Sequence, residues 1–217
     1  EFNLAAIFPR EDPSDAFVAN YYKTLEDVPP GKIIGTSSVR RVAFLNKYYP
    51  HLEVRELRGN LMTRLSKLDN QEYDAILLAT AGLKRLNLES RIRARLPINQ
   101  FVPAIGQGAI AIEVLSVRED LKELCKLLNH EKTFCEISAE REVGSYLGAN
   151  CGVPIAVYCT IEGQKIQIEA IVLDADSHDF YRAFVSGNYQ DSIILAQECA
   201  QILIKQGVES ILAKYRV

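Results

Sequence analysis

The sequence predicts an α/β domain followed by a smaller α+β unit. Over residues 32–114, apolar strand-like runs alternate with helical patterns across short connections, which is typical of βα units. Over 131–217, helical patterns flank three consecutive runs that alternate like antiparallel strands. A third observation concerns function. At 35–41, 57–64 and 79–85, a strand end is followed by a helix that carries arginine in its first residues.

The elements of the first unit follow from turn signals and helical spacing. Pro50 ends the first helix, and Asn60 is the predicted N-cap of the second, with Leu61, Leu65 and Leu68 on its inward face. The sheet is expected to be parallel or mixed. Predicted strands lie at 4–8, 32–36, 52–57, 74–79 and 108–114, and predicted helices at 38–48, 60–69 and 81–88.

A segment with two prolines and a glycine, residues 96–107, predicts a crossing between the units. Leucines at helical spacing predict the helix that follows it, and a glycine-rich loop surrounds Cys151. The later predicted helices are 118–129, 132–147, 190–206 and 208–215, and the later predicted strands are 154–160, 165–173 and 179–186.

Composition excludes several classes of protein. Hydrophobic residues make up 48% of the 217 residues and charged residues 24%, as in ordinary soluble domains. No apolar run is long enough to span a bilayer and no signal core opens the chain, so we expect a cytoplasmic protein with no membrane partner. Five cysteines without a C-x-x-C pair favour reduced thiols, and three scattered histidines predict no metal site.

Charge is distributed unevenly along the chain. Residues 31–95 carry an excess of Lys and Arg, whereas the segments before and after them are acidic. A basic block within an acidic chain favours an anionic small-molecule ligand over a nucleic acid, whose binding proteins are more often basic throughout.

The arginine-bearing junctions predict a site for several carboxylates. The carboxyl ends of neighbouring parallel strands converge, so Arg40, Arg41, Arg58, Arg64 and Arg85 are expected around one cleft. The guanidinium fork matches a carboxylate, and a helix N-terminus adds backbone N–H donors. Two alternatives stay open at this point: phosphate as the ligand, although no Walker loop is present, and arginines that are ordinary solvated charges.

Helix N-terminal hydroxyls and a loop thiol complete the set of candidates. Thr36, Ser37 and Ser38 lie at the start of the first helix, where one carboxylate can bind, while Arg40 and Arg41 diverge by about 100° on the helix and can serve two different carboxylates. Cys151 lies between Gly148 and Gly152, where its thiol is accessible; the alternative is an ordinary loop cysteine.

Several long motifs occur along the chain. They are Gly35-Thr36-Ser37-Ser38-Val39-Arg40-Arg41, Arg58-Gly59-Asn60-Leu61-Met62-Thr63-Arg64-Leu65, Leu78-Ala79-Thr80-Ala81-Gly82-Leu83-Lys84-Arg85 and Gly106-Gln107-Gly108-Ala109, together with Glu11-Asp12-Pro13-Ser14-Asp15-Ala16-Phe17 and the Cys151 loop. Together they resemble the porphobilinogen deaminase family, also called hydroxymethylbilane synthases. The resemblance covers the whole chain.

The resemblance implies a transferase of tetrapyrrole and haem biosynthesis. Such enzymes condense four porphobilinogen units, with loss of ammonia, on a dipyrromethane cofactor held by a thioether to a cysteine, and then release hydroxymethylbilane. Cys151 matches that cysteine, although Ala149-Asn150 replaces the usual Gly-Gly before it. Cofactor and substrate binding is implied for Thr36, Ser37, Ser38, Arg40, Arg41, Arg58, Asn60, Arg64, Arg85, Gln107 and Gly108.

The resemblance also implies an architecture and a missing part. We expect a periplasmic-binding-protein-like α/β domain at 14–102, a remnant of a first domain and hinge at 1–13, a return segment at 103–130 and a C-terminal α+β domain at 131–217. The family's catalytic aspartate, in a His-Ser-x-Lys-Asp-x-Pro motif, would lie upstream of Glu1, so no catalytic residue is assigned in this chain.

Because that motif is missing, the chain alone is expected to be inactive, and a complementary N-terminal fragment would be a partner. The resemblance also implies a monomer, which is typical of the family. The alternatives are a non-catalytic binder of small polycarboxylates and a degenerate remnant.

Overall fold

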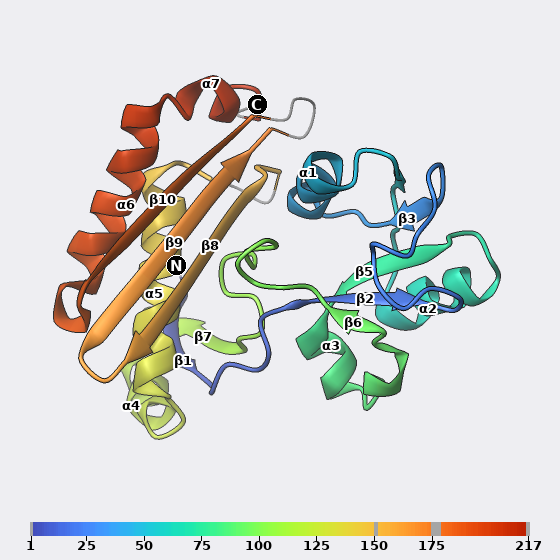
Figure 1. The fold of residues 1–217 in the computed structure, drawn as a ribbon. Coiled ribbons are helices and arrows are strands. Elements are labelled where there is room, and N and C mark those ends of the chain that lie inside the picture. The colour runs from blue at the N-terminus through green and yellow to red at the C-terminus, as the bar shows by residue number, and fades with distance from the viewer. Residues whose placement is uncertain (1, 150–151, 175–178, 216–217) are drawn as a thin grey trace.

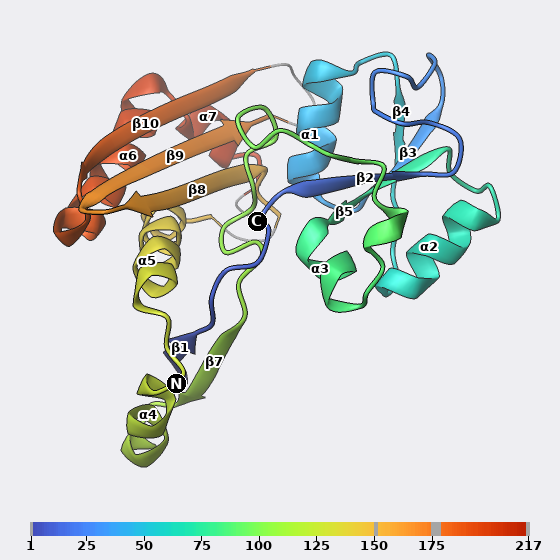
Figure 2. The same ribbon diagram turned by 60° about the horizontal axis from the view of Figure 1, so that its bottom comes forward.

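The computed structural model describes residues 2–149, 152–174 and 179–215. It contains an α/β part and an α+β part side by side, with a third, smaller group of elements that extends away from both (Figures 1 and 2). The α/β class and the C-terminal unit of three antiparallel strands with helices are as the sequence predicts.

The α/β part is built on a five-stranded mixed sheet in the order β4-β3-β5-β2-β6. Strand β3 is parallel to both β4 and β5, so the three arginine-bearing junctions do end at one edge of the sheet. Helices follow each of these strands. The bounds are β2 (Asp15–Ala19), β3 (Ile33–Gly35), α1 (Val39–Tyr48), β4 (Glu53–Arg55), α2 (Leu61–Asp69), β5 (Ala75–Ala79), α3 (Thr80–Arg85), the short 3₁₀ turn η1 (Glu89–Arg91) and β6 (Ala94–Arg95).

Sequence reasoning missed β2, which lies next to β5 and is antiparallel to it. All five of its residues are buried, so exposed polar and buried apolar residues do not alternate along the strand. It begins with Asp15, a charged residue at a fully buried position. A short apolar run behind a buried charge gives no periodic signal, and its pairing with β5 and β6, some sixty to eighty residues away in the chain, makes it a strand.

Strand β7 (Ala111–Leu115) corrects another expectation. We expected it within the alternating α/β unit, but it pairs antiparallel with β1 (Phe2–Ile7) in a separate two-stranded ribbon. Helix α4 (Glu119–Lys126) packs on this ribbon through Cys125 against Ala6 and Val114. Ribbon and helix project away from the rest of the molecule (Figure 2).

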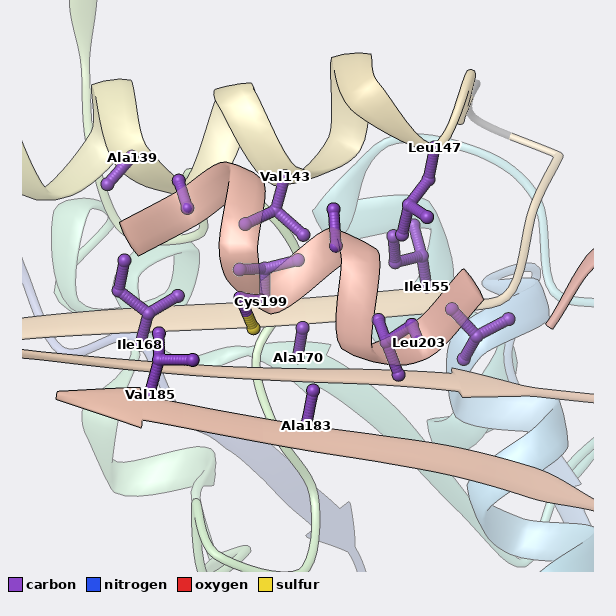
Figure 3. Packing of buried hydrophobic residues seen from close by; sticks show 14 of the residues in the cluster. Ala139, Val143, Leu147, Ile155, Ile168, Ala170, Ala183, Val185, Cys199 and Leu203 are labelled. Atoms are coloured by element: carbon purple, nitrogen blue, oxygen red, sulfur yellow. The ribbon is translucent and has the colours of Figure 1, made fainter. Parts of the chain in front are cut away.

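The C-terminal part is a sheet of order β10-β9-β8 with two long helices on one face (Figures 1 and 3). Its elements are α5 (Glu131–Tyr146), β8 (Ile155–Glu162), β9 (Lys165–Leu173), β10 (Phe180–Asn188), η2 (Tyr189–Asp191), α6 (Ser192–Gln206) and α7 (Glu209–Leu212). Val143, Ala170, Cys199 and Leu203 are among the residues that fill the core between helices and sheet (Figure 3).

The opposite face of the C-terminal sheet packs against the α/β part. Ile171 and Leu173 belong to the same buried cluster as Phe44 of α1 and Phe101 of the crossing segment. Lys47 of α1 also lies over the Phe180 ring, 3.5 Å from its centroid. Because both parts contribute to one apolar cluster, α1 is held between its own sheet and the C-terminal sheet.

Candidate functional site

A cavity of about 860 Å³ lies where α1, the crossing segment and α5 meet. Each element contributes part of the wall. The lining residues are Leu4, Ser38, Val39, Arg40, Ala104, Ile105, Ser138, Arg141, Glu142, Gly144, Ser145, Ala149, Val153, Ile155 and Ile193. Of the residues proposed from the sequence, Ser38 and Arg40 line this cavity.

The N-terminus of α1 opens beside the cavity. Ser38 is its N-cap, and the Ser38 hydroxyl accepts a hydrogen bond from the Arg41 amide at 3.5 Å. Thr36 is buried and its hydroxyl accepts from the Ser38 amide at 3.2 Å, while the Ser37 hydroxyl donates to the Leu57 carbonyl. No acidic residue lies in the first turn, so the helix dipole favours an anion there.

Arg40 and Arg41 do not diverge toward separate ligands, because both side chains contact one buried carboxylate, Asp15. Arg41 Nε and Arg40 Nη2 each donate to Asp15 Oδ1 at 2.9 Å, and Arg40 Nη2 lies 2.8 Å from Oδ2. Arg40 and Arg41 are 3% and 7% exposed. Sequence reasoning did not select Asp15, although an aspartate directly before an apolar run is an available signal.

Asp15 is ionised in this setting. Burial alone would raise its pKa, but the charges of Arg40 and Arg41 outweigh burial and hold the pKa below its ordinary value. Burial lowers the pKa of Arg40, and the Asp15 carboxylate offsets that effect in part. The three groups therefore form a buried cluster with one net positive charge.

An acid-unfolding measurement tests this ionisation. A carboxylate with a depressed folded pKa stabilises the protein above its unfolded pKa and loses that contribution as the pH falls through the folded value. We therefore expect the Asp15 contribution to begin to decline near pH 4, the ordinary aspartate range, and to be lost as the pH falls through the lower folded pKa. Urea unfolding of the wild type and of Asp15→Asn at several pH values should give a stability difference that shrinks in this range. A difference that is constant with pH would contradict the assignment.

The other arginines proposed from the sequence lie outside the cavity wall. Arg58 is exposed and its Nε pairs with Glu56 at 2.6 Å, whereas Arg64 is half-buried and its Nε donates to the Gly59 carbonyl at 2.8 Å. Burial and the nearby charge of Arg41 lower the pKa of Arg64. Arg85 is exposed, and its Nη2 donates to the Gly108 carbonyl at 2.9 Å.

Asn60 is confirmed as the N-cap of α2. Its Oδ1 accepts from the Thr63 amide at 2.9 Å and from the Thr63 hydroxyl at 3.0 Å. The side-chain oxygen is therefore engaged by the helix it caps.

Gln107 connects the crossing segment to the buried cluster. Its Nε2 donates to the Pro13 carbonyl at 2.5 Å and to Asp15 Oδ1 at 3.0 Å, and its Oε1 accepts from Arg40 Nη2 at 3.2 Å. Gly108 follows, with φ of +91° and its backbone packed against that of Glu11. Its role is therefore to let the backbone of the crossing segment turn at this point.

A second buried ion pair, which sequence reasoning missed, joins the opening segment to the C-terminal part. Arg10 Nη1 lies 2.5 Å from Glu140 Oε1 on α5, and Arg10 Nε donates to the Gln107 carbonyl at 2.9 Å. Glu140 also accepts from the amides of Gly106 at 2.7 Å and Cys159 at 2.9 Å. The Glu140 carboxylate thus holds together the crossing segment and strand β8.

Cys151, the proposed cofactor attachment, lies outside the described residues. Ala149, two positions earlier, lines the cavity together with Val153, two positions later. Among the described residues, no group of three or more His, Cys, Asp or Glu side chains is placed to hold a metal ion. No helix in the described ranges is long and apolar enough to cross a membrane.

Comparisons with solved structures gave matches of limited extent. A putative methionine-binding lipoprotein from Bacillus subtilis aligns with a TM-score of 0.43 and 16% identity over 61% of this chain and 63% of that chain. The second substrate-binding domain of a putative amino acid ABC transporter from Streptococcus pneumoniae aligns with a TM-score of 0.38 and 15% identity over 65% and 64% of the two chains.

Sequence comparisons gave matches over nearly the whole chain. The porphobilinogen deaminase from Neisseria meningitidis serogroup A is 46% identical over 211 residues, which cover 97% of this chain and 68% of the relative. The porphobilinogen deaminase from Bordetella parapertussis is 44% identical over 213 residues, or 98% and 68% of the two chains.

Two family models also match. The model described as "Porphobilinogen deaminase, dipyromethane cofactor binding domain" matches residues 1–123, and the model described as "Porphobilinogen deaminase, C-terminal domain" matches residues 134–205. Both models and both relatives agree with the motifs noted in the sequence. The chain belongs to the porphobilinogen deaminase family.

Proposed function

We propose that this chain serves the porphobilinogen deaminase reaction, in which four porphobilinogen units are joined stepwise into hydroxymethylbilane with release of ammonia. The observation that carries the proposal is a cavity walled by Ser38 and Arg40 on one side and by Arg141 and Ala149 on the other. Porphobilinogen carries an acetate and a propionate, so a site rich in guanidinium groups suits both the substrate and the lengthening product.

The dipyrromethane cofactor fits the residues present. Arg40 Nε is buried and has no hydrogen-bond partner among the described residues, so it offers a donor to a ligand carboxylate. Ser38, the helix N-terminus and Arg141 offer further donors around the same cavity. When bound, the cofactor supplies the covalent primer to which substrate units are added.

We assign the remaining predicted residues to two roles. Thr36, Ser37, Arg41, Asn60, Gln107 and Gly108 shape and hold the site, because their polar atoms or backbone are engaged by the protein. Arg58, Arg64 and Arg85 lie further out, where partial exposure lets them exchange their present partners for carboxylates of a longer chain. The catalytic group that assists loss of ammonia is not assigned to any residue of this chain.

We propose Cys151 as the point of cofactor attachment through a thioether. Intact-mass spectrometry of the chain produced in cells that make porphobilinogen should show an increment of two pyrrole units. The Cys151→Ser variant should lack it, because it removes the sulfur that forms the bond. Cys135→Ser, at a half-buried cysteine of α5, is the matched control and should keep the increment. An increment that persists in Cys151→Ser would place the attachment elsewhere.

We also propose a complementary N-terminal fragment as a partner. Large apolar side chains are exposed on β1, β7, α4 and the segments that flank them, and we call this surface the ribbon face. It consists of Phe2, Ile110, Leu115, Val117, Leu124, Leu127 and Leu128. Val117 and Leu127 are more than 80% exposed, and exposed apolar side chains in number often mark an interaction surface. A partner that covers these side chains would gain hydrophobic stabilisation.

Mixing experiments test the partner proposal. The partner would be the third of the Neisseria relative that this chain does not match. We expect association in analytical ultracentrifugation and formation of hydroxymethylbilane only in the mixture. Leu127→Asp should weaken association about tenfold or more, because it places a charge in the buried contact. Ile194→Asp, at an exposed isoleucine of α6, should leave it unchanged. Equal effects of the two substitutions would argue against the ribbon face.

The division into domains and the compartment are proposed on the same basis. We propose a hinge and first-domain remnant at 1–13, the α/β domain at 14–102, a return segment at 103–130 and the C-terminal domain from 131. The separate β1–β7 ribbon supports this division. The four described cysteines are free thiols, which supports a reducing, cytoplasmic compartment.

A further inference from the structure

We propose that Asp15 is a positioning residue for carboxylate binding: it fixes Arg40 and Arg41 so that Arg40 can present its Nε–H to a ligand in the cavity. The proposal deepens the function proposed above and rests on it for the identity of the ligand, porphobilinogen. Asp15 is fully buried at the start of β2. It acts through the arginines, because the cavity lining includes Arg40 and does not include Asp15.

Three side-chain donors meet on one oxygen of Asp15. Its Oδ1 accepts from Arg40 Nη2 and Arg41 Nε, both at 2.9 Å, and from Gln107 Nε2 at 3.0 Å. These donors come from α1 and the crossing segment, which also form two walls of the cavity. The carboxylate therefore sets the positions of α1 side chains relative to the crossing segment.

The hydrogen bonds of Arg40 leave one direction open. Its Nη1 donates to the Val102 carbonyl at 2.7 Å, and its Nη2 contacts Asp15 and the Gln107 side-chain oxygen. Within the part of the chain that the structure describes, Nε–H is the buried donor of this side chain without an acceptor. Buried donors nearly always have a partner, and an oxygen of a ligand in the cavity can supply it here.

Charge and geometry make opposite predictions for the loss of the Asp15 charge. Asp15→Asn leaves two buried guanidinium groups without their counter-ion, so the site becomes more positive and a purely electrostatic effect would strengthen anion binding. The amide nitrogen of asparagine would instead face Arg40 Nη2, which now lies 2.8 Å from a carboxylate oxygen, and two donors repel. If positioning dominates, binding weakens.

Calorimetric titration of the full chain with porphobilinogen shows whether Asp15→Asn raises or lowers the affinity. We expect Asp15→Asn to bind about ten- to a hundredfold more weakly than wild type, the range for one lost charge-assisted hydrogen bond. Asp174→Asn is the matched control: Asp174 is also buried and paired with a cation, Lys214, but does not line the cavity. It should bind as wild type does. Binding by Asp15→Asn that is equal to or tighter than wild type would overturn the proposal.

Side-chain NMR of the wild type gives a readout that needs no variant to fold. Arginine Nε–H resonances of Arg40 and Arg41 should both be protected from exchange, and porphobilinogen should shift the Arg40 resonance more, because Asp15 already holds Arg41 Nε. An Arg41 shift as large as that of Arg40 would overturn the proposal. If wild type shows no porphobilinogen binding at all, the proposed function fails, while rapid exchange of both resonances without ligand would separately refute the role of Asp15.

Discussion

Replacement of Arg10 by methionine is expected to destabilise the protein by about 3–5 kcal/mol, the usual cost of leaving one partner of a buried ion pair alone. Arg10 and Glu140 side chains are 8% and 0% exposed, so water cannot replace the lost guanidinium. Among the described residues, Glu140 would keep the amides of Gly106 and Cys159 as its donors. Urea unfolding at neutral pH measures the loss.

The pH dependence of that loss identifies its cause. Burial raises the pKa of Glu140, and Arg10 offsets this in part. Without Arg10 the folded pKa rises further. Stability linked to a raised carboxyl pKa is present below the unfolded value, about 4.5, and is lost as the pH rises through the folded value. The destabilisation of Arg10→Met should therefore be smaller near pH 5 than near pH 7.

Two further variants serve as controls for Arg10→Met. The double variant Arg10→Met/Glu140→Gln should recover part of the stability at neutral pH, because it removes the buried charge and keeps one acceptor oxygen. Arg118→Met breaks an exposed pair with Asp120 and should change stability by less than about 1 kcal/mol. A loss in Arg10→Met that is equally small, or constant with pH, would show that Glu140 is not a buried charge that depends on Arg10.

Local patterns predicted the elements whose signals are local. Ser38 and Asn60 cap α1 and α2, and each cap bonds to a residue three positions later. Strands β3, β4 and β5 end in the arginine-bearing junctions that the sequence showed. Strand β2 and the partner of β7 were missed because they depend on pairing across about 60 and 100 residues of chain, which leaves no mark in a short window.

The candidate site divides in the same way. Arginine at a helix start is visible in the sequence and predicted an anion site. The long-range ion pairs leave no such mark in the sequence, because Asp15 is 25 residues from Arg40 and Glu140 is 130 residues from Arg10. Each carboxylate looks like a surface residue until the fold buries it. A sequence therefore indicates which charged residues could bind a ligand. It indicates less readily which of them already form ion pairs within the protein.

Replacement of Gly108 by alanine is expected to destabilise the protein more than the same replacement at a glycine with free space around the added Cβ. Gly108 has φ of +91°, and an added Cβ would lie 2.4 Å from the Glu11 carbonyl oxygen, too close for any real contact. Relief requires movement of the opening or crossing segment. Such a movement would break two hydrogen bonds to the Gly108 carbonyl oxygen. One comes from the Glu11 amide N–H at 3.1 Å, and the other comes from Arg85.

Gly31→Ala separates the two contributions, because Gly31 has φ of +77° with no atom within 4 Å of the added Cβ. It should lose only about 1 kcal/mol from backbone strain, whereas Gly108→Ala adds the steric clash and should lose about 3 kcal/mol or more. Urea midpoints of both variants test this prediction. Equal losses of stability would mean that the crossing segment can move to relieve the clash without destabilising the protein. Since Gln107 precedes Gly108 and holds Asp15, displacement of this backbone should also weaken porphobilinogen binding in the folded Gly108→Ala protein, and leave it unchanged in Gly31→Ala.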